Sequence, residues 1–249
     1  LKDALVVDIG GTTTDVGEVQ DGFPRLAGTS VMVADVRTNF AMPDVISIGL
    51  GGGSIVNEKD TMSIGPISVG HDLPYKAKVF SGDTLTATDL AVAGGRCKVG
   101  EVMPPPINSL DKLLEIMDKM ISDQVARART SNKDIPVIAV GGGSVMMPSK
   151  VYGLKVICPP HNDLANAVGA AIAQVSGQVS RVVLLNDSIN RDSAIKEVTD
   201  EATKLAVKRH ADPKSISVLT VSDMPLSYLP GNNLLINVTV VGDLLMEEI

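Results

Sequence analysis

Short hydrophobic runs that end at glycine-rich bends mark the start of this chain. Residues 4–9 form a mainly β-branched apolar run that stops at Gly10-Gly11, which is typical of a buried strand. Residues 15–20 predict a second strand, and Asp21-Gly22 after them is a strong hairpin signal. Alternating residues over 29–36 predict a third strand. We therefore expect the chain to open with an antiparallel meander.

The pattern changes between residue 39 and about residue 100. Glycine is dense there and no helical periodicity is evident, which predicts an irregular, β-rich, Gly-rich insertion. Three prolines, 104–106, end the segment as a stiff connector. The predicted domains are therefore an α/β domain made of residues 1–38 and 104–249, and an insertion of residues 39–103.

Beyond the prolines, helical and strand patterns alternate. A capped helix is predicted from Asn108 or Ser109 onward, because apolar residues then follow at helical spacing. Alternation of this kind predicts a mixed α/β sheet with covered faces. The further strands are expected at 136–140, 155–158, 181–185, 215–222 and 234–241, and the further helices at 164–175 and 193–210.

Composition narrows the class of protein. The chain has 249 residues and a formal net charge of −7, and clustered Lys or Arg that could neutralise nucleic-acid phosphates is absent. The six aromatic residues are too few and scattered for base stacking. No apolar run is long enough to span a membrane. Two lone cysteines and three scattered histidines match no disulfide framework or zinc spacing, so we expect reduced thiols and a cytoplasmic location.

The first candidate site is the segment from Asp8 to Asp15. Gly10 and Gly11 let the backbone approach an anion, and Thr12 and Thr13 add hydroxyl donors. An acidic loop would repel phosphate unless a cation intervened, so we expect Asp8 and Asp15 to hold Mg²⁺ through its waters. The competing interpretation is an ordinary Gly/Thr/Asp-rich hairpin. A Walker loop is excluded because no lysine follows the glycines.

The second candidate site is the run Gly141, Gly142, Gly143 and Ser144, which follows a predicted buried strand. A glycine run there lets a flat nucleoside lie against the backbone, and a short helix after it offers free N–H groups. The hydrophobic segments on both sides argue against a solvated linker. We therefore predict a nucleoside contact at these four residues.

The third motif is IGLGGGSIV, with Gly52, Gly53 and Ser54 at its centre. It is followed by a GPISVG element at 65–70 and by TATD, which ends at Asp89. With DIGGTTTDV before it, this order resembles the ATP-dependent hydantoinase/oxoprolinase family, in its hydantoinase A-type domain. Where that family usually has a PGPACYG-like stretch, this chain has Leu73–Phe80 and no cysteine.

The resemblance carries expectations about fold and activity. It places the chain in the acetate/sugar kinase, heat-shock chaperone and actin superfamily, as an actin-like (ribonuclease H-like) ATPase domain, the second nucleotide-binding domain of a longer protein. The implied enzyme is an ATP- and magnesium-dependent hydrolase of cyclic amides such as hydantoin or 5-oxoproline. In it Asp8 and Asp15 would be catalytic, and Gly52, Gly53, Ser54 and Asp89 would face substrate.

Two other functions fit the same motifs. One is a small-molecule kinase of the same superfamily, and the other is a non-catalytic nucleotide-sensing or assembly subunit. In all three cases we expect a missing first domain or a partner subunit to complete the nucleotide-binding site. The chain could also form an oligomer. Neither nucleic acid nor membrane is expected as a partner. Because only one phosphate loop is present, this chain alone should bind nucleotide weakly and turn it over little.

Overall fold

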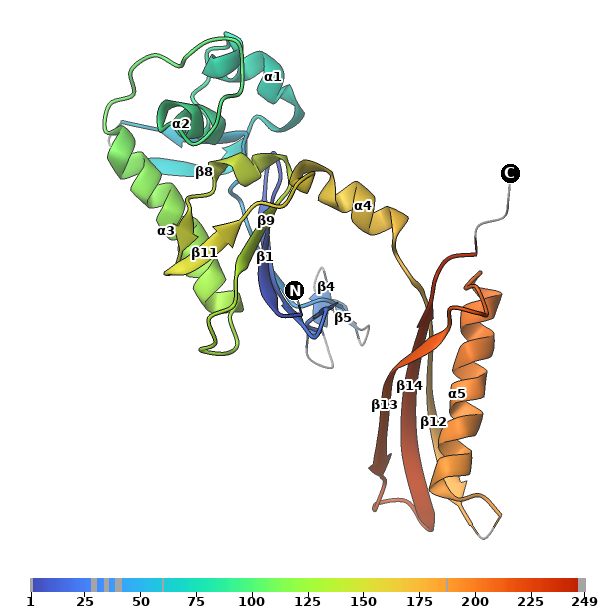
Figure 1. Cartoon of the computed structure of the whole chain (residues 1–249). Helices are drawn as coiled ribbons and strands as arrows, with labels where there is room; N and C mark the ends of the chain where they lie inside the picture. The colour runs from blue at the N-terminus through green and yellow to red at the C-terminus, as the bar shows by residue number, and fades with distance from the viewer. Residues whose placement is uncertain are drawn as a thin grey trace. The chain divides into compact units, whose positions relative to one another are not determined.

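The computed structural model describes residues 2–27, 31–33, 36–38, 42–59, 61–186 and 188–245. The chain divides into two compact units, residues 1–166 and residues 167–249 (Figure 1). Each unit has its own hydrophobic core. The predicted domain boundaries differ from this division and stay a prediction.

Unit 1 is built on a seven-stranded mixed sheet with the order β10-β11-β9-β1-β2-β3, in which β6 also pairs with β2. β1 runs antiparallel to β2 and parallel to β9, and β9 runs parallel to β11. The structure thus confirms the predicted fold class, an α/β unit whose mixed sheet opens with an antiparallel meander. The strands of this sheet are β1 (Ala4–Ile9), β2 (Thr14–Gln20), β3 (Phe23–Pro24), β6 (Val45–Ile48), β9 (Val137–Val140), β10 (Lys150–Val151) and β11 (Leu154–Ile157).

One long helix, α3 (Leu110–Ala128), covers one face of this sheet (Figure 1). Alternate residues of β1, namely Leu5, Val7 and Ile9, are fully buried on that face and join the core with the apolar side of α3. The residues between them, including Asp8, are only half-buried. Alternation in β1 therefore places a carboxylate on the face opposite α3.

The glycine-rich segment is more regular than predicted and is not confirmed as an insertion. β6 pairs with β2 in the main sheet, and α2 packs against α3. The sequence missed α2 because Ala87–Val92 are all buried, so no polar face reveals a helical period. The further elements of unit 1 are β4 (Val31–Val33), β5 (Val36–Thr38), β7 (Ser54–Asn57), β8 (Ser63–Ser68), η1 (Gly70–Asp72), α1 (Leu73–Lys76), η2 (Lys78–Phe80), α2 (Ala87–Ala93), η3 (Gly142–Met146) and η4 (Asn162–Leu164). The strand predicted over 29–36 falls partly outside the described residues.

Unit 2 is a three-stranded antiparallel sheet, order β12-β14-β13, with one helix along it (Figure 1). Small residues of the helix, such as Ala194 and Ala202, pack against buried residues of β14, such as Ile236 and Val238. Its strands are β12 (Val175–Leu185), β13 (Ser217–Pro225) and β14 (Asn232–Gly242), its helix is α5 (Arg191–Lys208), and α4 (Ala165–Ala171) spans the boundary between the units. The helix predicted over 164–175 is shorter than expected because β12 begins at Val175.

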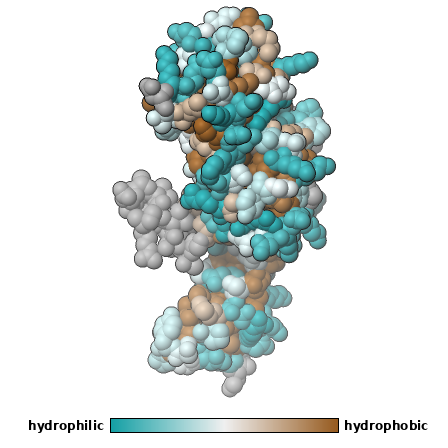
Figure 2. Space-filling view, turned by 90° about the vertical axis from the view of Figure 1, so that its left-hand side faces the viewer, coloured by the Kyte–Doolittle hydropathy of each residue, from teal (hydrophilic) through white to brown (hydrophobic). Residues whose placement is uncertain are grey.

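The surface is mixed in character. Hydrophobic residues lie in patches among hydrophilic ones on the face that Figure 2 shows. In the described ranges, no helix is both long and apolar enough to cross a lipid bilayer.

Candidate functional site

Asp8 and Asp15 lie directly opposite each other across the β1–β2 pair. Register partners in an antiparallel pair present their side chains to the same face. Asp15 is in turn the partner of Ser47 on β6, and the Ser47 hydroxyl donates a hydrogen bond to the Asp15 carboxylate. Two acids and a hydroxyl therefore form a row across three strands. Nothing in the sequence pointed to Ser47, because its strand pairing depends on a contact 32 residues away.

The bend between the two acids is held by backbone hydrogen bonds. The Gly10 N–H donates to the Thr13 carbonyl at 2.9 Å. The carbonyls of Gly10 and Gly11 accept from the N–H groups of Gly52 and Gly53 at 3.0 and 2.7 Å. In a trans peptide the C=O and N–H point in opposite directions, so the N–H groups of Gly11 and Thr12 point away from Gly52 and Gly53.

These outward N–H groups make the bend suitable for an anion. Gly11, Thr12 and Thr13 are exposed, and within the described ranges no protein acceptor takes a hydrogen bond from their backbone N–H groups. Unpaired backbone N–H groups in succession form an anion-binding concavity. The bend of residues 10–13 therefore has a geometry that suits an anion, with the threonine hydroxyls beside it.

The second glycine run, residues 51–53, packs against the back of this bend. A Cβ on Gly51 would lie 2.5 Å from the Thr12 nitrogen, and one on Gly53 would lie 3.0 Å from the Gly11 carbonyl oxygen. Glycine is required here because the two backbones approach so closely. Gly52 and Gly53 are buried, so they support the 10–13 bend from behind.

Ser54 and Asp89, the other two residues predicted to face substrate, are fully buried. The Ser54 hydroxyl accepts from the Gly51 N–H at 2.9 Å. The Asp89 carboxylate accepts from the N–H groups of Val79 and Thr86, each at 2.7 Å, and from the Thr86 hydroxyl at 2.8 Å. This is a capping box at the start of α2. Their place in substrate binding stays a prediction, and neither side chain is exposed to solvent.

The GGGS bend, residues 141–144, lies beside the 10–13 bend. β9 is parallel to β1 with Val140 as the partner of Asp8, so both strands end at the same edge of the sheet. Gly141 has φ +84°, and a Cβ on it would collide with the Asp8 carboxylate and the Ile9 carbonyl. A Cβ on Gly143 would lie 2.9 Å from the Gly10 carbonyl oxygen. The backbones of the two predicted sites are therefore in close contact.

Gly142 differs from its neighbours. It is exposed, and a Cβ there would meet no atom within 4 Å. Its N–H and that of Gly143 begin the short helix η3, where backbone donors are left without intrahelical acceptors. Gly142 therefore presents open backbone between two glycines that contact residues 8–10. Ser144, the last residue of the run, is 3% exposed.

The side chains beside the bend can be compared with the ligands that a divalent cation prefers. Asp8 and Asp15 supply two carboxylates on one face. Over the described ranges, no group of three or more His, Cys, Asp or Glu residues could hold a metal. Two carboxylates next to an anion-binding bend fit Mg²⁺, which keeps several waters and shares its ligands with phosphates. They do not make an all-protein metal cage.

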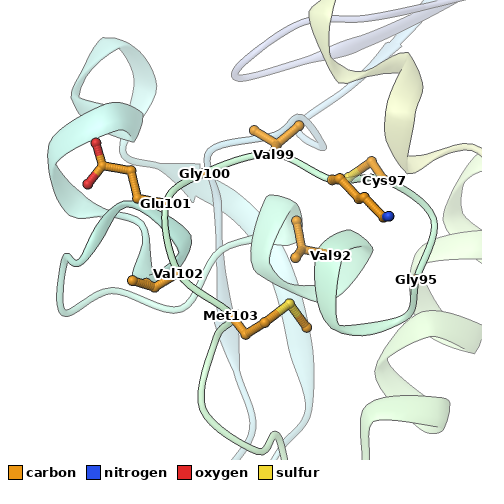
Figure 3. Close-up of a pocket in the computed structure, with 9 residues that line it drawn as sticks. Val92, Gly95, Cys97, Val99, Gly100, Glu101, Val102 and Met103 are labelled. Atoms are coloured by element: carbon orange, nitrogen blue, oxygen red, sulfur yellow. The ribbon is translucent and has the colours of Figure 1, made fainter.

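A cavity of about 420 Å³ lies elsewhere in unit 1, beside α2 and the segment that follows it (Figure 3). Val92, Val99, Val102 and Met103 give it an apolar lining, with Cys97 at one side. Burial raises the pKa of the Cys97 thiol, so this cysteine is a weaker nucleophile at neutral pH than an ordinary one. The cavity does not include the loops described above.

A family model matches the first part of the chain. Residues 1–103 match the family model described as hydantoinase/oxoprolinase. This match confirms the resemblance for that part of the chain. No curated protein matches the chain.

Two solved structures share the fold over nearly the whole chain. The ATP-dependent caprolactamase from Pseudomonas jessenii aligns with a TM-score of 0.67 at 15% identity, covering 100% of this chain and 47% of that chain. A nucleotide-free acetone carboxylase aligns with a TM-score of 0.63 at 14% identity, covering 98% of this chain and 46% of that one. The chain thus spans less than half the length of either structure.

Proposed function

We propose that this chain, whose residues 1–103 match the hydantoinase/oxoprolinase family, is the nucleotide-binding part of a longer ATP-dependent enzyme that opens cyclic amides. The adjacency of the 10–13 bend and the GGGS bend supports this most directly. A Cβ on Gly143 would touch the Gly10 carbonyl oxygen, so the two bends are close enough for one nucleotide to reach both. Two solved structures with this fold are named as ATP-dependent.

In this proposal each part of the surface has one task. The N–H groups of Gly11 and Thr12, with the hydroxyls of Thr12 and Thr13, bind the phosphates. Gly142 contacts the nucleoside through its exposed backbone, and the buried Gly143 and Ser144 hold Gly142 in place. Asp8 and Asp15 hold Mg²⁺ through its waters, and Ser47 fixes the direction of the Asp15 carboxylate. When bound, Mg²⁺ would neutralise charge on the phosphates.

ATP would be needed because an unactivated amide is a poor electrophile. Phosphorylating the amide oxygen makes the carbonyl carbon easier for water to attack, and stabilisation of the transferring phosphoryl group is the main contribution a protein makes to such a step. In this chain the outward N–H groups of the 10–13 bend supply that stabilisation. We propose hydantoin, 5-oxoproline or a related lactam as the substrate class.

Binding to the 249-residue chain tests the nucleotide site. We expect weak, magnesium-dependent binding of ADP in calorimetry, because the other half of the nucleotide would be enclosed by the rest of the longer protein. Asp8→Asn should abolish the magnesium dependence. Asp21→Asn is the matched control, since Asp21 lies in the turn at the far end of β2 with φ +51°, which asparagine tolerates. Binding that is equal in the wild type and Asp8→Asn would contradict the proposal.

Phosphate release by the longer protein tests the reaction. We expect release to be stimulated by a cyclic amide and not by its open-chain counterpart, with no phosphorylated product. A stable phosphorylated product would identify a kinase instead. Release that is indifferent to the amide would identify a nucleotide sensor.

A further inference from the structure

Asn162 contacts the GGGS bend through both its backbone and its side chain. Its carbonyl accepts a hydrogen bond from the Gly141 N–H at 2.8 Å. Its side-chain amide donates to the Ser144 hydroxyl. Asn162 begins η4, which packs against η3, so a single residue from a separate segment holds both ends of the glycine run.

The sequence around Asn162 fixes this contact. Pro159 and Pro160 precede it, and the Asn162 N–H donates to the Pro159 carbonyl at 3.2 Å. His161 has φ +58° and the Leu164 N–H donates to its carbonyl at 3.0 Å. The turn is therefore closed by its own hydrogen bonds before Asn162 reaches the bend. That leaves the amide pre-organised for Ser144.

The Ser144 hydroxyl has few hydrogen-bond partners available other than the Asn162 amide. It is 3% exposed, so water replaces the amide poorly, and a buried hydroxyl without a partner is costly. A serine hydroxyl both donates and accepts, so either orientation of the Asn162 amide keeps the bond. Losing the amide would leave the Ser144 hydroxyl without this bond, so the bend would be held by its backbone hydrogen bonds, such as that from the Ser144 N–H to the Gly141 carbonyl at 3.0 Å.

We propose that Asn162 is a positioning residue that holds the GGGS bend in the shape that receives the nucleoside, while the phosphates are bound independently of it. This rests on the function proposed above. Asn162 has no contact with the 10–13 bend among the hydrogen bonds of the described residues. Binding of the nucleoside therefore depends on Asn162, and binding of the phosphate chain does not.

The test compares two magnesium-bound probes on the 249-residue chain. Mg·ADP carries a nucleoside, and Mg·tripolyphosphate does not. In calorimetry, Asn162→Ala should weaken Mg·ADP binding by roughly tenfold, the effect of one lost hydrogen bond to a buried group, and leave Mg·tripolyphosphate binding unchanged. Asp163→Asn is the matched control, because Asp163 is exposed and adjacent, and it should alter neither.

Two more variants keep the outcome decisive if Asn162→Ala fails to fold. Asn162→Asp can still accept from the Ser144 hydroxyl and should restore most of the Mg·ADP affinity. Ser144→Ala removes the same bond from the other side, so it should weaken Mg·ADP binding and leave Mg·tripolyphosphate binding unchanged. Equal loss of both probes, or no loss of Mg·ADP, would overturn the inference alone. Wild-type chain that binds neither probe would overturn the proposed function and this inference with it.

Discussion

Arg96 and Asp118 form a bidentate ion pair, with both nitrogen–oxygen distances at 2.7 Å. The same guanidinium also donates to the Met146 carbonyl at 2.6 Å. Arg96 follows α2, Asp118 lies on α3, and Met146 ends η3. One side chain therefore ties the segment after α2 to α3 and to Met146, two residues beyond the GGGS bend.

Replacing Arg96 by lysine should lower the free energy of unfolding by about 1 kcal/mol, because lysine keeps the charge but cannot make the paired bonds and reach Met146 at once. Urea denaturation of the whole chain measures this. The matched control is Arg127→Lys, since Arg127 makes one weaker bond, to Gln124 at 3.2 Å. Equal stability of the Arg96→Lys variant and the wild type would show that the geometry of the pair does not matter.

Gly141 and Gly142 should respond differently to alanine. Gly141→Ala places a methyl group against Asp8 and Ile9 at a residue with φ +84°, and we expect a loss of roughly 1–3 kcal/mol in stability. Gly142→Ala meets open space and should leave the melting temperature nearly unchanged while weakening Mg·ADP binding. Thermal melts and calorimetry of the two variants check this pair. A large loss of stability in Gly142→Ala would mean that the bend packs differently from the arrangement described.

Asp89→Ala tests whether this residue is structural. Its carboxylate caps α2 and also binds the Val79 N–H, so we expect a loss of about 2–4 kcal/mol from the unpaired buried donors. Asp89→Asn keeps one acceptor oxygen, so we expect a smaller loss of stability. In the longer protein, a well-folded Asp89→Asn variant should retain its KM for the amide. A raised KM without loss of stability would instead support the predicted contact with substrate.

Glu18 predicts a pH dependence of stability. Burial raises the pKa of this carboxyl, but hydrogen bonds from Thr130 and Gln20 and the charge of Arg25 outweigh it, so the net pKa lies below the ordinary 4.5. A carboxyl with a lowered pKa in the folded state stabilises the protein above its unfolded pKa, and this stabilisation is lost as the pH falls through the folded pKa.

We therefore expect this contribution to be complete at neutral pH and to fade below about pH 4.5, the ordinary value. Glu18→Gln should flatten that part of the curve of unfolding free energy against pH. Glu58→Gln serves as the comparison, because Glu58 is half-buried and forms no ion pair among the described residues. If the unfolding free energies of Glu18→Gln and the wild type fall equally at acid pH, Glu18 is not a source of the pH dependence of stability.

Many strands and bends of unit 1 can be predicted from the pattern of hydrophobic and turn residues over short stretches of sequence. The apolar run of β1, the glycines at its end and the hairpin signal at Asp21-Gly22 predict the meander that the structure contains. The run into Gly141 predicts β9 and the bend after it. These signals act within a few residues, where backbone preference and side-chain alternation suffice.

Other features had no local signal. α2 is buried on all sides, so it lacks the polar face that reveals a helix. The separation of unit 2 was not anticipated, since its strands and helix have the same patterns as those of unit 1. The hydroxyl of Ser47 and the amide of Asn162 act on residues 32 and 18 positions away.

The amino-acid sequence alone thus determined the order of strands and bends and the residues that make an acidic, glycine-lined loop, because each depends on neighbours along the chain. The tertiary structure decided which residues lie together: that the two bends share one edge of the sheet, that the 51–53 glycines back the loop, and that Ser54 and Asp89 are buried. Those outcomes depend on strand pairing and close packing between distant segments, and no periodicity within one segment encodes them.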